Sequence, residues 1–212
     1  MNLDKYNNII WDWNGTLLDD RWLCLSIINK ICKKANLAPI SDNEYLEKFN
    51  FPVMQFYQEL GFNFNKISFK EIAKIYIREY EQKKNNCLLR KQARIVLQYF
   101  QKSKKKQYIL SAYSHKELVE IINYYKITTF FKKISGLDNH YADSKLKNGI
   151  KMMNLYQLKP EETIIIGDTT HDFEVASSLK IYSILIENGH QSKEKLEHCK
   201  TLIIKDLNEL LK

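Results

Sequence analysis

The stretch IIWDWNGTLLDD, residues 9–20, decides the fold. Its opening residues, Ile9–Trp11, form a short apolar run of the kind that makes a buried strand. The run ends at a carboxylate, Asp12, and the chain then turns through Asn14, a glycine and a threonine before leucine returns. In an open α/β sheet, ligands bind beyond the carboxyl ends of the strands. The stretch therefore predicts both a central strand and a site at its end.

Short apolar runs rich in β-branched residues recur along the chain and alternate with stretches of helical spacing. Several runs are apolar on both faces, which suits a parallel sheet covered by helices. The predicted strands are Asn8–Trp11, Gln107–Leu110, Lys133–Ser135, Thr163–Ile166, Tyr182–Ile186 and Leu202–Ile204. The predicted helices between them are Ala93–Gln101, Lys116–Tyr125, Leu146–Leu155 and Phe173–Leu179, and Ser114 with Glu117 is spaced for a capping box. The alternation predicts an α/β fold with a doubly wound, mostly parallel sheet.

A helical region interrupts this pattern after the first predicted strand. Its predicted helices are Arg21–Ala35, Asp42–Lys48, Val53–Leu60 and Ser68–Lys84. Because the interval contains no convincing strand, we expect an inserted helical cap over the edge of the sheet. The expected division is a core made of residues 1–19 and 85–212, and a cap made of residues 20–84.

The composition is that of a globular protein. The chain has 212 residues, of which 44% are hydrophobic and 27% charged, so it can bury a sizeable core. No apolar run approaches the ~20 residues of a membrane span, and the polar start MNLDKYNN does not resemble a signal peptide. We therefore expect a cytoplasmic protein with no membrane partner. The cysteines, at positions 24, 32, 87 and 199, are widely spaced, which favours buried thiols over disulfides or a zinc site.

The net charge of +8 is carried mainly by lysine. A positive field attracts polyanions, so a nucleic-acid-binding module is one interpretation. The densest basic run, Lys102–Lys106, lies between a predicted helix and a predicted strand, and we interpret it as a solvated connection. Scattered lysines without an aromatic-basic motif argue against nucleic acid. The same field would help gather a phosphorylated small molecule.

Polar side chains follow three of the predicted strands, at the points where these strands end. They are Asp12, Asn14 and Thr16 after the first strand, Ser111 and Ala112 after the second, and Asp168 and Asp172 after Thr163–Ile166. Lys145 and Lys147 open the helix that precedes this last strand. Such parts fit phosphoryl transfer, which needs a nucleophile and compensation for the phosphate charge. Asp12 can be the nucleophile, and Asp12 with Asp168 supplies the hard oxygen ligands that suit Mg²⁺.

With these motifs in order, the chain resembles the haloacid dehalogenase-like (HAD) hydrolases, especially phosphoglycolate-phosphatase-like members with a helical cap. The motifs are D-W-N-G-T-L at Asp12–Leu17, I-L-S-A at Ile109–Ala112, S-K-L-K-N-G at Ser144–Gly149 and I-I-I-G-D-T-T-H-D at Ile164–Asp172. Each motif alone is a weak signal, but the set covers nearly the whole chain in the right sequence. The resemblance implies a HAD-like core and a Mg²⁺-dependent phosphatase acting on a small-molecule phosphate monoester.

The resemblance also implies a role for individual residues. Asp12 would be the nucleophile that forms an aspartyl-phosphate, and Asp172 would bind the metal or a water on it. The implied metal ligands are Asp12, Asn14 through its backbone carbonyl, Asp168 and Asp172. The implied phosphate-binding residues are Trp13, Asn14, Ser111, Ala112 and Lys145, and the catalytic set is Asp12, Asn14, Ser111 and Lys145. Lys145 is preferred to Lys147 because S-K-L-K-N-G directly opens the helix.

One residue departs from the pattern of the family's phosphatases, which usually have Asp two residues after the nucleophile. That Asp protonates the leaving oxygen and then activates the attacking water. Asn14 keeps the size and the backbone carbonyl, so metal binding is expected to survive, but it cannot exchange a proton at neutral pH. General acid–base help contributes ~10²–10⁴ in rate. We expect the loss to be large for an alkoxide leaving group and smaller for a phenolate.

Asn14 therefore leaves four outcomes open: a slow phosphatase, recruitment of another group from the cap or the substrate, a long-lived aspartyl-phosphate that serves transfer or regulation, or a site that only binds. The chain can be a catalytically weakened or non-catalytic HAD-like protein that binds a phosphorylated ligand or a protein partner. Dehalogenation is disfavoured because that branch lacks the acidic pair that Asp168 and Asp172 supply. Specificity is expected from cap loops near Phe49–Pro52 and Gly61–Asn65, and the oligomeric state is expected to be monomer or homodimer.

Overall fold

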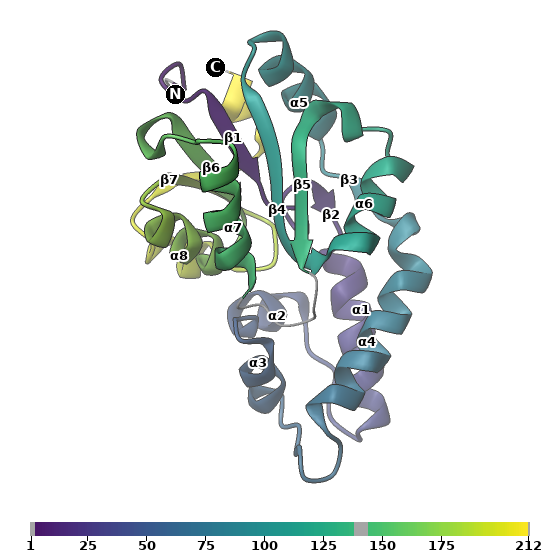
Figure 1. Cartoon of the computed structure of the whole chain (residues 1–212). Helices are drawn as coiled ribbons and strands as arrows, with labels where there is room; N and C mark the ends of the chain where they lie inside the picture. Colours follow the sequence, from purple (N-terminus) through teal and green to yellow (C-terminus); the bar gives the residue numbers. More distant parts are fainter. Residues whose placement is uncertain (1–2, 138–143, 212) are drawn as a thin grey trace.

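A computed structural model describes residues 3–137 and 144–211, and it shows a sheet between two layers of helices with a helical lobe at one end (Figure 1). Within these residues the main sheet has the strand order β5-β4-β1-β6-β7-β8. The strands are β1 Asn8–Trp11, β4 Lys106–Ser114, β5 Phe131–Leu137, β6 Thr163–Gly167, β7 Tyr182–Ile186 and β8 Leu202–Ile204. Every neighbouring pair is parallel. The predicted doubly wound α/β fold is confirmed.

The central strand β1 is buried on both faces, and its side chains alternate between two apolar clusters. Ile9 and Trp11 pack in the cluster that contains α5 and α6, whereas Ile10 packs in the cluster that contains α7 and α8. These helices are α5 Ala93–Lys102, α6 His115–Tyr124, α7 Ser144–Leu155 and α8 Thr170–Leu179. A strand covered on both sides is apolar on both faces, which is why the central runs do not alternate with polar residues.

Shorter elements complete the core. They are the helix α9 Lys193–Glu197 and the 3₁₀ turns η1 Lys84–Asn86, η2 Thr128–Phe130, η3 Pro160–Glu162 and η4 Leu207–Leu211. The predicted capping box before α6 is wrong. Among the described residues, Ser114 donates to the carboxylate of Glu117 but accepts from no backbone amide. Ser114 ends strand β4, and its hydroxyl is engaged by the glutamate instead. No described helix is long and apolar enough to cross a bilayer.

The helical lobe consists of α1 Arg21–Lys34, α2 Asp42–Lys48, α3 Val53–Glu59 and α4 Phe69–Lys83. Capping boxes at Ser41 and Ser68 begin α2 and α4, and α1 packs along α4. Figure 1 shows the lobe beyond the end toward which the arrow of β5 points. A parallel sheet therefore directs the carboxyl ends of its strands at the lobe.

The chain passes between sheet and lobe through a short antiparallel pair that the sequence pattern does not predict. The two strands are β2 Leu18–Asp19 and β3 Leu88–Leu89. Two residues are too few to carry a period, so such a pair leaves no signal in sequence. This pair holds side by side the two chain segments that connect the lobe to the sheet. The division into a core and a cap of residues 20–84 stays a prediction.

Candidate active site

The loop after β1 is shaped to bring two carboxylates together. Asp12 continues the ladder, because its backbone amide donates to the carbonyl of Ile166 at 2.9 Å. Gly15 adopts φ +70°, and a Cβ there would overlap the carboxylate of Asp168. Thr16 donates its hydroxyl to Oδ1 of Asp168 at 2.8 Å. The glycine and the threonine thus hold Asp168 against the loop that carries Asp12.

The turn from β6 into α8 supplies a third carboxylate. Asp172 lies in the first turn of α8, where the amide and the hydroxyl of Thr169 donate to its Oδ2 at 3.1 and 2.7 Å. Asp12, Asp168 and Asp172 are all buried, and each offers an oxygen within 4.8 Å of the others. Three buried carboxylates at this spacing form a candidate cation site.

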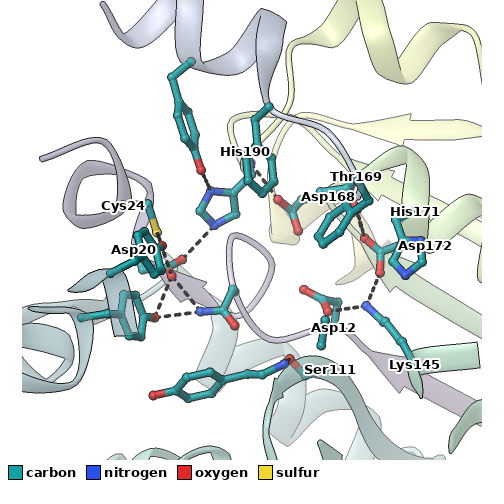
Figure 2. Close-up of a pocket in the computed structure, with 18 residues that line it drawn as sticks. Asp12, Asp20, Cys24, Ser111, Lys145, Asp168, Thr169, His171, Asp172 and His190 are labelled. Atoms are coloured by element: carbon teal, nitrogen blue, oxygen red, sulfur yellow. Dashed lines mark hydrogen bonds and ion pairs between the residues drawn. The ribbon is translucent and has the colours of Figure 1, made fainter. Parts of the chain in front are cut away.

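Lys145, from the first turn of α7, reaches into this acidic cluster (Figure 2). Its Nζ lies 2.5 Å from Oδ1 of Asp12 and 2.6 Å from Oδ1 of Asp172, and the residue is only 2% exposed. Lys147, two residues further along the same helix, is exposed. The structure therefore brings Lys145, and not Lys147, to the carboxylates.

Charge in the cluster is unbalanced. Burial raises the pKa of Asp12, Lys145 opposes this, and Asp172 and Asp168 add to it, so that the pKa is raised to about 8. Burial also raises the pKa of Asp168, whereas Lys145 overcomes burial at Asp172 and lowers its pKa. One ammonium against three carboxylates leaves an excess of negative charge. A divalent cation would cancel that excess, and hard carboxylate oxygens are the ligands Mg²⁺ prefers, so the residues present fit this metal.

The end of β4 forms another wall of the site. Ser111 and Ala112 line the cavity beside Asp12, and the Ser111 hydroxyl accepts from the backbone amide of Tyr113 at 3.1 Å. Trp13 lies differently from the other predicted site residues. Its side chain is fully buried and packs on Tyr125, with ring centroids 6.0 Å apart, and it does not line the cavity. Any phosphate contact from Trp13 is therefore limited to its backbone amide.

Asn14 lines the cavity, and its side-chain amide has a fixed orientation. Its Nδ2 donates to Oδ2 of Asp20 and to the hydroxyl of Tyr80, both at 2.7 Å. A carboxylate only accepts hydrogen bonds, so the nitrogen end must face Asp20. Because the nitrogen end of the amide faces Asp20 and Tyr80, Oδ1 is the end left for other contacts.

A family model described as haloacid dehalogenase-like hydrolase matches residues 9–186, more than half of the chain. The chain belongs to this family. A search of curated proteins finds no match by sequence. A haloacid dehalogenase-like hydrolase from Streptococcus pneumoniae has a similar structure, with a TM-score of 0.82, 23% identity, and coverage of 98% of this chain and 97% of that one.

Two further solved structures share the fold of this HAD hydrolase. A haloacid dehalogenase-like hydrolase from Bacteroides fragilis has a TM-score of 0.83 and 18% identity, covering 97% of this chain and 99% of that one. A predicted phosphoglycolate phosphatase from Haemophilus somnus has a TM-score of 0.78 and 17% identity, covering 98% and 97%. These likenesses show that the sheet and the helical lobe occur together in other members of the family.

The hydrolase contains a second buried polar group that sequence reasoning missed, centred on Asp20. Oδ1 of Asp20 accepts from the amide of Gly15 at 2.9 Å and lies 3.1 Å from Nε2 of His190, and Oδ2 accepts from Tyr80 at 2.8 Å (Figure 2). Burial raises the pKa of Asp20, but His190, Asn14 and Tyr80 outweigh burial and lower the pKa to about 2. Asp20 is therefore a fixed anion between the first loop and the lobe.

His190 ties the same group to the carboxylate cluster of the site. Its backbone amide donates to Oδ2 of Asp168 at 2.7 Å, and its Nδ1 lies 2.7 Å from the hydroxyl of Tyr45 on α2. Burial lowers the pKa of His190, but Asp20 overcomes burial and raises it. The sequence carries a signal for this residue, since E-N-G-H directly follows the predicted strand Tyr182–Ile186 and so lies at the same edge of the sheet as the other strand ends.

The cavity above the carboxylates has a volume of about 190 Å³ and is walled largely by rings. The aromatic side chains that line it are Tyr45, Phe49, Phe51, Tyr76, Tyr80 and Tyr113. Phe49 and Phe51, which belong to the first predicted specificity loop, line this cavity, whereas residues Gly61–Asn65 of the second loop line a different hollow in the lobe. His171 also lines the cavity, where its ring stacks on Phe51 at 4.8 Å.

Proposed function

We propose that this HAD hydrolase is a Mg²⁺-dependent phosphatase of the phosphoglycolate-phosphatase-like type. It hydrolyses a small-molecule phosphate monoester through an aspartyl-phosphate on Asp12. The observation that carries the proposal is the buried contact of Asp12 with Lys145 inside a cluster of carboxylates that lacks charge balance. The likeness to a predicted phosphoglycolate phosphatase supports the choice of a phosphate ester.

Each residue of the site has a place in this mechanism. Asp12, the carbonyl of Asn14, Asp168 and Asp172 would hold Mg²⁺. When bound, the ion supplies the positive charge that lets a phosphate dianion approach a carboxylate. The groups that would hold the phosphate oxygens are the hydroxyl of Ser111, the amides of Trp13, Asn14 and Ala112, and the ammonium of Lys145. An oxygen of Asp12 attacks phosphorus, the leaving oxygen departs, and water then hydrolyses the aspartyl-phosphate.

Asn14 limits the rate of this enzyme. Its Oδ1 can accept a hydrogen bond from the attacking water and so orient it, but an amide takes up no proton at neutral pH. A loss of general acid–base help lowers the rate by roughly 10²–10⁴. We propose a slow phosphatase in which positioning and charge compensation supply most of the acceleration.

The proposal extends to the cap, the kind of substrate and the location of the enzyme. Residues 20–84 act as a cap whose rings close the cavity over the phosphate site, and the substrate is a phosphorylated small molecule drawn by the +8 charge. The cysteines at positions 24, 32, 87 and 199 are buried and form no disulfide, which agrees with a cytoplasmic location.

The test is phosphate release from p-nitrophenyl phosphate and a panel of sugar, glycolate and nucleotide phosphates. Wild type and Asp12→Asn are compared in Mg²⁺ and in EDTA. We expect release by the wild type in Mg²⁺ only, and none above background from Asp12→Asn. Release by the wild type that is unchanged in EDTA, or that survives in Asp12→Asn, would refute the proposal.

A second candidate function rests on Asn14. A site that holds phosphate and metal but moves no proton can serve to bind a phosphorylated ligand or a partner without turnover. In that case Mg²⁺ and orthovanadate together would raise the melting temperature of the wild type, and the substrate panel would give no phosphate release. Measurable turnover by the wild type on any ester of the panel eliminates this candidate.

A further inference from the structure

The substrate class can be narrowed further, on the basis of the proposed phosphatase function. We propose that the enzyme acts on aryl phosphates, in which phosphate is esterified to the hydroxyl of a small aromatic ring. Two independent features of the cavity support this class. One is the scarcity of proton donors around the leaving oxygen, and the other is the aromatic character of the wall that the leaving group would meet.

Asn14 is the first polar residue of the cavity that offers no proton to the leaving oxygen. Its amide nitrogen donates toward Asp20 and Tyr80, so the end left for the cavity is Oδ1, which carries no proton. Asp20 enforces this orientation, because flipping the amide would set Oδ1 of Asn14 against a carboxylate. Asn14, two residues after the nucleophile, therefore offers only a hydrogen-bond acceptor to the cavity, and it cannot protonate a departing oxygen.

Several other polar hydrogens on the cavity wall are also engaged, whereas the Ser111 hydroxyl, which accepts from the amide of Tyr113, is assigned to the phosphate oxygens rather than to the leaving oxygen. The engaged donors are the Tyr80 hydroxyl with Asp20, the Tyr113 hydroxyl with Glu81, the Thr169 hydroxyl with Asp172, and the Lys145 ammonium with Asp12 and Asp172. Both ring nitrogens of His190 likewise contact Asp20 and Tyr45. Groups committed to charged partners in a buried site are poor proton donors to a third group.

Apart from Ser111, His171 has a ring nitrogen on the cavity wall without such a partner in the described part of the chain, and it must enter the test. Its Nε2 is buried and has no hydrogen-bond partner among the described residues, while its Nδ1 lies 3.3 Å from Glu174. The ring itself stacks on Phe51 with an interplanar angle of 30°. We assign His171 to the aromatic wall, as a flat surface rather than as an acid.

That wall combines rings from the lobe and from the core. The ring of Phe49 contacts those of Tyr45 and His190, with centroids 5.2 and 5.5 Å apart, and the ring of Phe51 stacks on His171. Aromatic side chains favour offset-stacked and edge-on contacts with another ring. With a volume of about 190 Å³, the cavity suits a small planar group better than an extended polar one.

The chemistry of the leaving group agrees with the missing acid. In the first step a bond forms between Asp12 and phosphorus, and the bond from phosphorus to the aryl oxygen breaks with its electron pair on oxygen. A phenol has a pKa of about 10, like the tyrosine side chain, so its anion departs unaided and takes a proton from water. An alkyl alcohol ionises almost as reluctantly as water, whose pKa is about 15.7. In the second step water attacks phosphorus and Asp12 is released, so that ester and water give phenol and phosphate.

The test compares phenyl phosphate with benzyl phosphate, which carry the same ring but release a phenoxide and an alkoxide. Wild type is compared with the exchange variant Asn14→Asp/Asp20→Asn, which places a carboxylate beside the nucleophile and keeps an amide–carboxylate pair. A single Asn14→Asp change would instead oppose two carboxylates. We expect kcat/KM of the wild type to favour phenyl phosphate by roughly 10²-fold or more, and the exchange to raise kcat/KM for benzyl phosphate by a similar factor.

The role of the aromatic wall is tested with substitutions that leave the residues assigned to the metal and the phosphate unchanged. His171→Phe retains a ring but removes the nitrogen, and it should preserve the preference for phenyl phosphate. Phe51→Leu should raise KM for phenyl phosphate by about 2–10-fold, more than it lowers kcat. Phe64→Leu, which removes a ring of the lobe outside this cavity, is the matched control. Melting temperatures confirm that each variant is folded.

Each outcome separates this inference from the proposed function. Equal rates for the phenyl and benzyl esters in the wild type, or loss of the preference for phenyl over benzyl phosphate in His171→Phe, would overturn the aryl class while leaving the phosphatase intact. A wild type that hydrolyses glycerol phosphate better than phenyl phosphate would do the same. If neither wild type nor the exchange variant releases phosphate from any ester, the phosphatase function itself fails. Activity in the exchange variant alone overturns the inference and favours ligand binding in the wild type.

Discussion

A single ammonium group decides the state of the acidic cluster. Lys145 is buried between Asp12 and Asp172, and its ammonium group makes charge-assisted hydrogen bonds to both carboxylates. Breaking a buried ion pair by removing one partner is costly because the other partner stays behind as an uncompensated charge. We therefore expect Lys145 to stabilise the fold and, in the proposed mechanism, to hold the nucleophile Asp12 in place.

We therefore predict that Lys145→Met destabilises the protein by about 3 kcal/mol at neutral pH, and that Mg²⁺ recovers part of this loss. Phosphate release should fall at least ~10²-fold, because a group that compensates phosphate charge is gone. Urea denaturation with and without Mg²⁺ measures the first effect. Lys147→Met changes an exposed lysine of the same helix and is the matched control. Equal stability of the two variants would contradict the prediction.

Asp20 should make the free energy of unfolding depend on pH in the acid range. Its pKa is lowered to about 2 in the folded protein, below the ordinary value of 3.8, so its contribution is present above the ordinary pKa and is lost as pH falls through the folded one. We predict that the stability difference between wild type and Asp20→Asn shrinks by about 2 kcal/mol between about pH 5 and about pH 2.

Urea midpoints across that range give the measurement, with Asp19→Asn as the control, since Asp19 is the exposed neighbour of Asp20. A difference that is independent of pH would show that Asp20 is not held as an anion by His190, Asn14 and Tyr80.

At the scale of elements, the site is made by two turns, one after β1 and one after β6. Both are tight because glycine backbone lies directly against a carboxylate, Gly15 against Asp168 and Gly167 against Asp172. The turns place side chains from distant parts of the chain within reach of each other. Apolar strands followed by polar turns make this partly readable from sequence.

Gly15 allows this contact to be tested separately from backbone conformation. Gly15 and Gly61 both have positive φ, so alanine costs about 1–2 kcal/mol at either position. At Gly61 the nearest atom to a new Cβ is 3.5 Å away, whereas at Gly15 the Cβ would overlap Asp168. We predict that Gly15→Ala weakens Mg²⁺ binding at least ~10-fold, as Asp168 must move, while Gly61→Ala leaves it unchanged. Calorimetric titration with Mg²⁺ measures both, and equal affinities would contradict the prediction.

At the scale of the whole molecule, the sheet was predictable and the contacts between lobe and core were not. The strand β6 carries isoleucine at three successive positions, Ile164–Ile166, and such a run indicates a covered parallel sheet from the sequence alone. Asp12, Asp168 and Lys145 could be placed at one edge because strand ends meet there. Tyr45 and Tyr80 could not, since they read as packing residues of α2 and α4, and only the folded chain shows them bonded to His190 and Asp20.

The central claim is that phosphate passes through Asp12 before it reaches water. The stereochemical course at phosphorus tests it most directly. The substrate is a phenyl thiophosphate made chiral with oxygen isotopes and hydrolysed by the wild type in labelled water with Mg²⁺. Each in-line displacement inverts phosphorus, so attack by Asp12 followed by attack by water predicts overall retention of configuration. Inversion in the thiophosphate product would mean that water attacks the ester directly, and it would contradict the role assigned to Asp12.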